Sequence, residues 1–343
     1  MRYVFYSLAF LLVLLSAPLM VFCLFGLFQG LDVAQGLKSI ARNLTGEELI
    51  YDVRQRYRSD LMVAKQRRVI WMGDLENEQL NEASGLAAAR QNQGIYFSIN
   101  DSGNAPQLFA FHADGRHVRS WIVDYSESHD FEDLASFTYE GQQYVLIADT
   151  GDNLYWRPEV RLLVIPEPDL GGVGDDSLAP AWVIRFRYPD GQRDVESVAV
   201  DEAEERIYLI SKRRVPPELF SLPLRPKGTL ITAKYEGRLE QLPQPSARDL
   251  REDPNWGRYR SSPTALAMQG RTAIVATYRD SYLFSKGKGE SWAEAFRGTP
   301  QRVALPDIYG LEAAAFDVDE KNLLLVNERK DGTGRAALYA VDL

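Results

Sequence analysis

The chain has 343 residues, of which 45% are hydrophobic and 25% are charged, a composition that excludes a disordered or collagen-like protein. Its formal net charge of −9 argues against nucleic acid as a partner, because non-specific binding needs basic patches that displace counterions. The single cysteine, Cys23, lies in the apolar N-terminus. The rest of the chain therefore has no disulfide scaffold and no cysteine-based zinc site or nucleophile.

The N-terminus is a long apolar run. Residues 3–31 contain no charged side chain and consist mainly of Leu, Phe, Val and Ala. The run is longer than the apolar core of a secretory signal peptide and long enough to span a bilayer as a helix. No small-residue cleavage site ends it, and Phe22 before Cys23 does not fit lipoprotein processing. We therefore predict an uncleaved transmembrane signal-anchor over residues 1–31; the alternative is a cleaved signal peptide.

The charges that flank this run bear on its orientation. Arg2 precedes it, whereas Lys38 and Arg42 follow it, so the positive-inside rule favours a cytoplasmic C-terminal part. The very short N-terminal tail is instead typical of an exported protein. On that ground we expect a single-pass protein of the inner (cytoplasmic) membrane, with its C-terminal domain in the periplasm.

Residues 32–67 form a linker between this anchor and the main domain. Within it, residues 47–65 place apolar side chains at roughly helical spacing, with acidic residues early and basic residues late, which suits the helix dipole. This pattern predicts a stalk helix.

One pattern recurs five times after residue 80. A polar residue leads a short apolar strand that contains alanine, and a second, more hydrophobic strand follows, with further strands after it. The second strands are expected over residues 95–100, 144–149, 207–212, 273–279 and 323–327. Repeats of about 40–50 residues with four strands each are typical of a β-propeller.

The fifth repeat stops after its third strand, at Leu343. Residues 68–72 can supply the missing fourth strand, which would tie the two ends of the domain together and leave no open sheet edge. We therefore predict an all-β fold, a β-propeller of five blades over residues 68–343. Six blades is the alternative, if a weak repeat lies within residues 231–260.

Polar residues recur at fixed places in these repeats. In a blade, the first strand borders the central channel and the second runs antiparallel to it, so the start of one and the end of the other share a face. The starts of the first strands carry Ser84, Glu132, Glu196, Thr264 and Glu312. In the first repeat Glu82 stands two residues before Ser84 and so lies on the same side of the strand. The ends of the second strands carry Asn100, Asp101, Asp149, Lys212, Arg279, Asn327 and Glu328. We expect these side chains to converge on one mouth of the channel.

Carboxylates crowded into a partly desolvated mouth repel one another unless a cation compensates them. Carboxylate and amide oxygens are hard donors, so Ca²⁺ is the cofactor we expect, with Mg²⁺ second. The expected metal ligands are Glu82, Asp101, Glu132, Asp149, Glu196 and Glu312. The alternative for each residue is a structural role, in which it bonds backbone amides and locks neighbouring blades.

Two functions fit such a mouth. In the first, a metal-dependent hydrolase, the ion polarises an ester, lactone or phosphoester, Lys212 and Arg279 bind an anionic group, and Glu196 or His129 activates water. The other expected substrate contacts are Asn100, Asp152, Asn153 and Asn327. The alternative is a non-catalytic propeller that holds a small-molecule or protein partner. Serine-hydrolase, zinc-protease, Walker and Rossmann motifs do not occur.

Several of these segments together form a set of recurrent motifs: Glu82–Ala87, Asn100–Gly103, Asp130–Ala135, Ala148–Asn153, Tyr188–Gly191, Asp194–Ser197 and Lys212. The set resembles a family of mostly uncharacterised bacterial exported β-propeller proteins. More distantly, the chain is similar to calcium-dependent lactonase and phosphotriesterase propellers and to phytase-like propellers. This resemblance implies a Ca²⁺ ion at the channel mouth that polarises an ester or binds phosphate. The fourth repeat departs from the pattern, with Thr264 in place of an acid.

Overall fold

The computed structural model describes residues 50–51, 65–125, 130–171, 176–245, 247–252, 257–306, 308–318, 322–328 and 335–343. The predicted signal-anchor, most of the linker and His129 lie outside these ranges. None of the helices within the described ranges is both long and apolar enough to cross a membrane.

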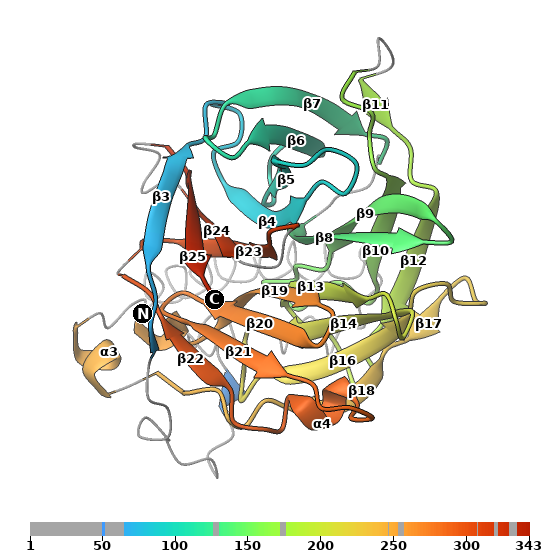
Figure 1. The fold of residues 1–343 in the computed structure, drawn as a ribbon. Coiled ribbons are helices and arrows are strands. Elements are labelled where there is room, and N and C mark those ends of the chain that lie inside the picture. The colour runs from blue at the N-terminus through green and yellow to red at the C-terminus, as the bar shows by residue number, and fades with distance from the viewer. Residues whose placement is uncertain are drawn as a thin grey trace, which may run out of the picture.

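Five antiparallel sheets surround a central axis (Figure 1). From the axis outward, blade 1 contains β4 (Ala83–Ala88), β5 (Ile95–Asn100), β6 (Gln107–His112) and β7 (His117–Val123). Blade 2 contains β8 (Phe131–Tyr139), β9 (Gln142–Asp149), β10 (Val160–Pro166) and β12 (Trp182–Arg187). Blade 3 contains β13 (Val195–Asp201), β14 (Arg206–Ser211), β16 (Glu218–Pro223) and β18 (Lys234–Arg238). Blade 4 contains β19 (Pro263–Gln269), β20 (Thr272–Thr277), β21 (Ser281–Ser285) and β22 (Gln301–Ala304). Blade 5 contains β23 (Leu311–Phe316), β24 (Asn322–Asn327), β25 (Ala337–Asp342) and β3 (Val69–Asp74).

The innermost strands β4, β8, β13, β19 and β23 pack against one another around the axis, which confirms the predicted five-bladed propeller. The described residues of the region 231–260, in which a sixth blade was the alternative, build no separate sheet. This region supplies β17 (Ile231–Thr232) to the edge of blade 2, β18 to blade 3, and the short helices α3 (Ala247–Glu252) and η1 (Gly257–Tyr259).

Strand β3 completes blade 5, as predicted, so the first described strand of the domain and the last one belong to the same sheet. β3 runs antiparallel to β25, with Trp71 opposite Tyr339. The same strand also fits closely against blade 1, because a Cβ atom at Gly73 would lie 2.0 Å from the carbonyl oxygen of Asp114. Closure therefore depends on a strand that precedes the other nineteen strands of the five four-stranded blades in the sequence.

Three further short strands each run parallel to the strand with which they pair. β2 (Lys65–Gln66) adds to β22, β11 (Ser177–Leu178) adds to β7, and β1 (Ile50–Tyr51) pairs with β15 (Arg214–Val215). β1 and Lys65 of β2 belong to the segment for which the sequence predicts a stalk helix. Their backbone is extended because it forms hydrogen bonds with the strands β15 and β22.

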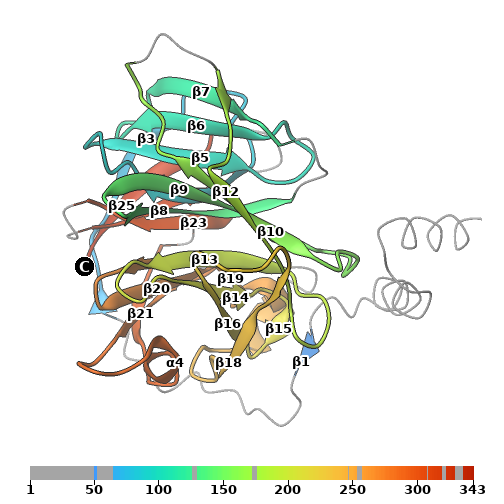
Figure 2. The ribbon, with the colours of Figure 1, turned by 90° about the vertical axis from the view of Figure 1, so that its right-hand side faces the viewer.

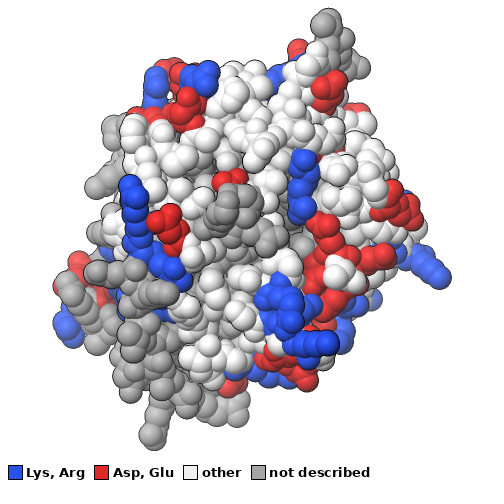
Figure 3. All heavy atoms as spheres, viewed as in Figure 1, with Lys and Arg blue, Asp and Glu red and all other residues white. Residues whose placement is uncertain are grey.

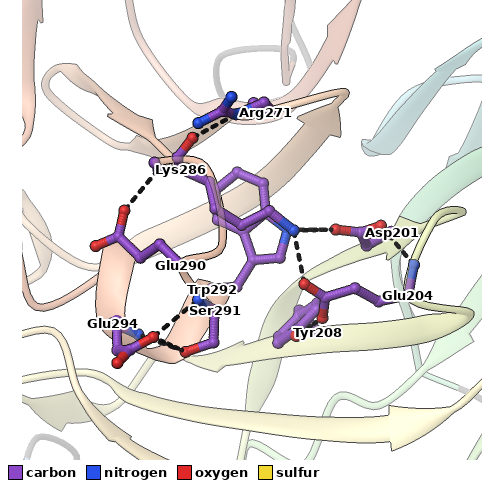
Figure 4. A network of polar contacts seen from close by, with 10 residues as sticks. Asp201, Glu204, Tyr208, Arg271, Lys286, Glu290, Ser291, Trp292 and Glu294 are labelled. Atoms are coloured by element: carbon purple, nitrogen blue, oxygen red, sulfur yellow. Dashed lines mark hydrogen bonds and ion pairs between the residues drawn. The ribbon is translucent and has the colours of Figure 1, made fainter.

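A buried polar network joins blades 3 and 4 (Figure 4). Trp292, on the short helix α4 (Trp292–Ala295) of blade 4, is fully buried and donates its indole N–H to Asp201 at the end of β13, at 2.5 Å. The Nζ atom of Lys286 bonds Asp201 at 3.0 Å and Glu204 at 2.6 Å, above the Trp292 ring. The network thus holds neighbouring blades together without any contact to the axis.

The two mouths of the channel differ. Figure 2 shows β13 from the side with its arrowhead on the left, so the inner strands start on the right and end on the left. The end with the arrowheads faces the viewer in Figure 3, where much of the surface around the grey atoms at the centre is uncharged. A pocket of about 60 Å³ there is lined mostly by alanine and other apolar side chains. The charged mouth lies at the opposite end.

Candidate metal centre

The same irregularity occurs in the inner strand of every blade. A β-bulge places one unpaired residue just after the start of the strand: Gly85, Glu132, Glu196, Thr264 and Glu312. A bulge re-aims the side chain of its extra residue. The exposed fractions of Glu132, Glu196 and Glu312 are 3%, 4% and 7%. The predicted acids of blades 2, 3 and 5 are therefore these bulge residues, whereas in blade 1 the bulge falls at Gly85 and Glu82 lies exposed at the rim.

Two overlapping groups of carboxylates have the geometry to hold a metal ion. Asp101, Asp130 and Glu132 each offer one oxygen atom within 4.8 Å of the others, and so do Glu132, Asp194 and Glu196. Glu132 is common to both groups. Its Oε1 atom is buried and has no hydrogen-bond partner, and the same holds for Oδ1 of Asp130. A buried acceptor without a donor is costly, so these oxygens favour a cation beside them.

The electrostatics of the site agree with this geometry. Burial and the neighbouring Glu196, followed by Asp101 and the other carboxylates, raise the pKa of Glu132 well above its usual value. Burial, Asp101 and Asp194 raise the pKa of Asp130 to about 7. In the absence of a metal, part of this carboxylate cluster therefore keeps its protons at neutral pH.

One side of the mouth is neutralised by the protein itself. Lys212 follows β14, is 8% exposed, and forms an ion pair with Glu196. Its Nζ atom also lies 5.1 Å from the centre of the Tyr278 ring. Tyr278 in turn hydrogen bonds with Glu312, which lowers the pKa of that carboxyl group but does not offset its burial.

Asp149, predicted as a metal ligand, lies outside both carboxylate groups. It is fully buried, forms an ion pair with Arg157 at 2.7 Å, and accepts hydrogen bonds from the Tyr125 hydroxyl at 2.9 Å and from the backbone N–H of Asp130 at 2.9 Å. These three donors make Asp149 a positioning residue for Asp130. Glu82, also predicted as a ligand, accepts from the Asn104 amide at 2.6 Å and is likewise outside both groups.

The predicted substrate contacts are used within the fold. Asn100 accepts from the backbone N–H of Glu82 and donates to the carbonyl of Gln79. Asn327 donates to the carbonyl of Tyr309 and accepts from the backbone N–H of Ala337. Both amides thus hold turns at the mouth.

The loop after β9 uses the next two predicted contacts in a similar way. Asp152 accepts from the backbone N–H groups of Trp156 and Arg157, at 2.7 and 3.1 Å. Asn153 accepts a hydrogen bond from Arg213, and Arg213 also pairs with Asp194 at 2.5 Å. These bonds shape the loop and anchor it to blade 3.

Arg279 does not border the carboxylate cluster. It pairs with Asp249 of α3, whereas the preceding residue, Tyr278, lies beside Lys212 and Glu312. In blade 5 the inward position likewise falls to Glu328, whose carboxyl pKa is raised by burial, then by Glu312, to about 8. Side chains one residue apart along a strand point to opposite faces. This explains why Tyr278 and Glu328 face the mouth, whereas the predicted residues Arg279 and Asn327 do not.

The sequence analysis missed Asp130, Asp194 and Tyr278 as members of the site, and it placed Glu328 at the mouth without giving it a role. For the first two a signal exists. Asp130 and Asp194 each stand two residues before a bulge glutamate, so the pattern Asp-x-Glu occurs at the same place in blades 2 and 3. Residues two apart on a strand share a face, which brings both carboxylates of each pair to the mouth.

Asp133 is a further buried carboxylate that the sequence analysis missed. It is fully buried on β8 and accepts three backbone N–H bonds, from Leu134 at 2.8 Å, Val198 at 2.7 Å and Leu266 at 3.2 Å. The three donors belong to blades 2, 3 and 4. Asp133 therefore joins three inner strands directly below the metal centre.

No model of a protein family matches the chain, and no curated protein matches it. Among solved structures, the chain is similar to glutaminyl cyclase of Myxococcus xanthus, with 10% identity, a TM-score of 0.46, and 82% of this chain and 99% of that chain covered. A chain of a nidogen/laminin complex gives 9% identity, a TM-score of 0.41, and coverage of 77% and 86%. U3-55K gives 15% identity, a TM-score of 0.37, and coverage of 76% and 68%.

Because these TM-scores are below 0.5, the similar structures say nothing about the function of this chain. The propeller is shown by its own five sheets. The resemblance to exported propellers and to lactonase-type propellers stays a prediction.

Proposed function

We propose that the acidic mouth binds a divalent cation, with Ca²⁺ favoured over Mg²⁺, and that the protein uses this ion to hydrolyse an ester, lactone or phosphoester. The observation that carries the proposal is Oε1 of Glu132, a buried carboxylate oxygen with no hydrogen-bond partner, at the point where the two carboxylate groups overlap. A cation at that point would satisfy this oxygen and reduce the repulsion among the surrounding acids.

The donor set favours Ca²⁺. The candidate ligands Asp101, Asp130, Glu132, Asp194 and Glu196 offer only carboxylate oxygens. Ca²⁺ accepts about six to eight oxygen ligands in flexible geometry, whereas Mg²⁺ demands a near-octahedral shell and keeps most of its waters. A cluster in which several carboxylates from three blades meet suits the larger ion.

The same residues have a role in catalysis. A bound divalent ion supplies Lewis-acid polarisation of a carbonyl or phosphoryl oxygen. Glu132 and Asp130 would hold it, while Arg213 fixes the Asp194 carboxylate from the side at 2.5 Å. Glu196 is the base we assign for water activation, and its ion pair with Lys212 orients it toward the cluster.

One observation favours the second candidate, a non-catalytic binding propeller. Both cations expected to bind an anionic substrate group, Lys212 and Arg279, are paired with the carboxylates of Glu196 and Asp249. Recognition of a free anion would have to break one of these ion pairs. In this second candidate the ion serves to grip a small-molecule or protein partner at the mouth.

We also propose that the domain is exported and anchored to the inner membrane in a single pass. The support is the uncharged apolar run over residues 3–31. A reporter enzyme that is active only in the periplasm, fused after Leu343, tests the orientation. We expect the fusion to be active, and an inactive fusion would place the domain in the cytoplasm.

The experiment uses purified full-length protein, its Glu132→Gln variant and a Glu167→Gln control. Glu167 is a second buried glutamate of blade 2, and it accepts the backbone N–H groups of Arg90 and Gln91, away from the mouth. Ca²⁺ binding is measured by calorimetry, and turnover is measured with aryl esters, lactones and aryl phosphodiesters, with Ca²⁺ or with EGTA.

We expect turnover that EGTA abolishes, and loss of both Ca²⁺ binding and turnover in Glu132→Gln but not in Glu167→Gln. Ca²⁺ binding without turnover of any of these substrates would select the non-catalytic candidate. No Ca²⁺ binding by the wild type would refute both.

A further inference from the structure

Lys212 is a buried cationic side chain that forms an ion pair with one of the bulge glutamates. It is 8% exposed and pairs with Glu196, and its ammonium group lies against the Tyr278 ring. The ion pair with Glu196 and the position over the Tyr278 ring both favour the charged form of the ammonium group. Lys212 therefore stays charged in the folded protein.

The carboxylates around this ammonium form a set of their own. Lys212 pairs with Glu196, its ammonium group lies against the Tyr278 ring that hydrogen bonds with Glu312, and its charge also interacts with the Glu328 carboxylate. Glu196 belongs at the same time to the group with Glu132 and Asp194. The mouth thus divides into two neighbouring acidic halves that share Glu196.

We propose that the mouth contains two cation positions and that the ammonium group of Lys212 permanently fills one of them, so that the native protein takes a single divalent ion. The filled position lies among Glu196, Glu312 and Glu328. The other lies among Asp101, Asp130, Glu132 and Asp194, and only this part rests on the proposed function. Lys212 is then the residue that sets the number of metal ions.

The charges explain why one position holds an ammonium group. Two divalent ions joined by one carboxylate repel each other strongly at low dielectric. A single positive charge at one position halves that repulsion and still compensates the buried glutamates. Removal of the ammonium leaves Glu196 and Glu312 without a cation, and buried carboxylates in that state take up either protons or a metal.

The test counts the Ca²⁺ ions that full-length protein binds in equilibrium dialysis at pH 8. At this pH a larger fraction of the carboxyl groups is ionised than at neutral pH. Lys212→Met removes the charge and keeps a long, unbranched side chain, whereas Lys212→Arg keeps the charge. Lys286→Met is a matched control, because Lys286 also bonds two carboxylates, Asp201 and Glu204, and lies 5.0 Å above an aromatic ring (Figure 4).

We expect one Ca²⁺ for the wild type, for Lys212→Arg and for Lys286→Met, and two for Lys212→Met. We also expect saturating Ca²⁺ to raise the melting temperature of Lys212→Met more than that of the wild type. One ion in both proteins overturns this inference but leaves the proposed function standing. No ion in the wild type and one in Lys212→Met refutes the proposed function and keeps the position of Lys212 as a cation site.

No ion in either protein overturns both. Failure of Lys212→Met to fold even in saturating Ca²⁺ also overturns the inference, since the inference requires Ca²⁺ to replace the lost charge.

Discussion

Gly151 packs against the carboxylate of Glu132: a Cβ atom at position 151 would lie 2.1 Å from Oε1 of Glu132 and 2.5 Å from the carboxyl carbon of Asp130. The glycine that follows the strand β9 and Thr150 therefore leaves the space in which two candidate ligands sit. Any other residue would push the carboxylates toward the axis or apart.

The first prediction concerns this glycine. Gly151→Ala moves the side chain of Glu132, and we expect Ca²⁺ affinity to fall about tenfold or more, which corresponds to about 1.4 kcal/mol. Calorimetric titration of the variant measures the change. Gly171→Ala is the control, because the nearest atom to a Cβ at Gly171 is 3.7 Å away. Equal affinities of Gly151→Ala and the wild type would place the ion elsewhere.

The second prediction is a pH dependence. Asp130 has its pKa raised to about 7 by burial, Asp101 and Asp194, and burial is the main cause that raises Asp152 and Glu328 to about 8. In the unfolded chain these groups lose their protons near pH 4. Between about pH 4 and 8 the native state holds more protons than the unfolded state, so these groups lower stability as the pH rises.

Ca²⁺ competes with the protons held by the carboxylates of the metal centre, Asp130 and Glu132, so its stabilising effect should grow as the pH rises through about 7. The measurement is the melting temperature with Ca²⁺ minus the melting temperature with EGTA, at each pH from 5 to 8.5. The contribution of titrating groups outside the site cancels in this difference. A Ca²⁺-induced shift that stays constant over this range would contradict the assignment of these carboxylates to the site.

The third prediction concerns Asp133. Asp133→Ala leaves the backbone N–H groups of Leu134, Val198 and Leu266 without their acceptor inside the propeller. Each unsatisfied buried donor costs about 1–3 kcal/mol, so we expect a loss of about 3 kcal/mol or more in the free energy of unfolding. Urea denaturation measures it. Ser136→Ala, on the same strand, should change stability by less than about 0.5 kcal/mol.

A loss below about 1 kcal/mol in Asp133→Ala would mean that the three blades do not depend on this carboxylate. The comparison with Ser136→Ala separates the effect of the carboxylate from that of a change in strand β8.

The fold can be predicted from the sequence because each blade repeats the same pattern of strands. The second strand predicted over residues 95–100 has the bounds of β5, and the closing strand predicted over residues 68–72 lies within one or two residues of β3. Hydrophobic runs separated by polar turns specify such strands locally, and the incomplete fifth repeat specifies where the chain must close.

The site is readable only in part. Glu132, Glu196 and Glu312 could be found because the repeat aligns them. Tyr278 was missed because the second strand of blade 4 was predicted to run to Arg279, whereas β20 ends at Thr277 and Tyr278 follows it directly, as Lys212 follows β14.

Pairing between blades was also beyond the sequence. The sequence predicts Asp149 as a metal ligand, but in the structure Arg157 and Tyr125 bind its carboxylate. Asp133 reads as one more acidic residue until the backbones of Val198 and Leu266 are seen to converge on it. Such contacts join residues far apart in the chain, and only the assembled propeller brings them together.

The central claim is tested most directly by anomalous diffraction from crystals of the protein grown with Ca²⁺. The account predicts one peak at about 2.3–2.6 Å from Oε1 of Glu132, with further carboxylates of Asp101, Asp130, Asp194 or Glu196 completing its shell. Crystals with saturating Ca²⁺ and no peak at the mouth, with Oε1 of Glu132 bonded to water or to a protein donor, would contradict it.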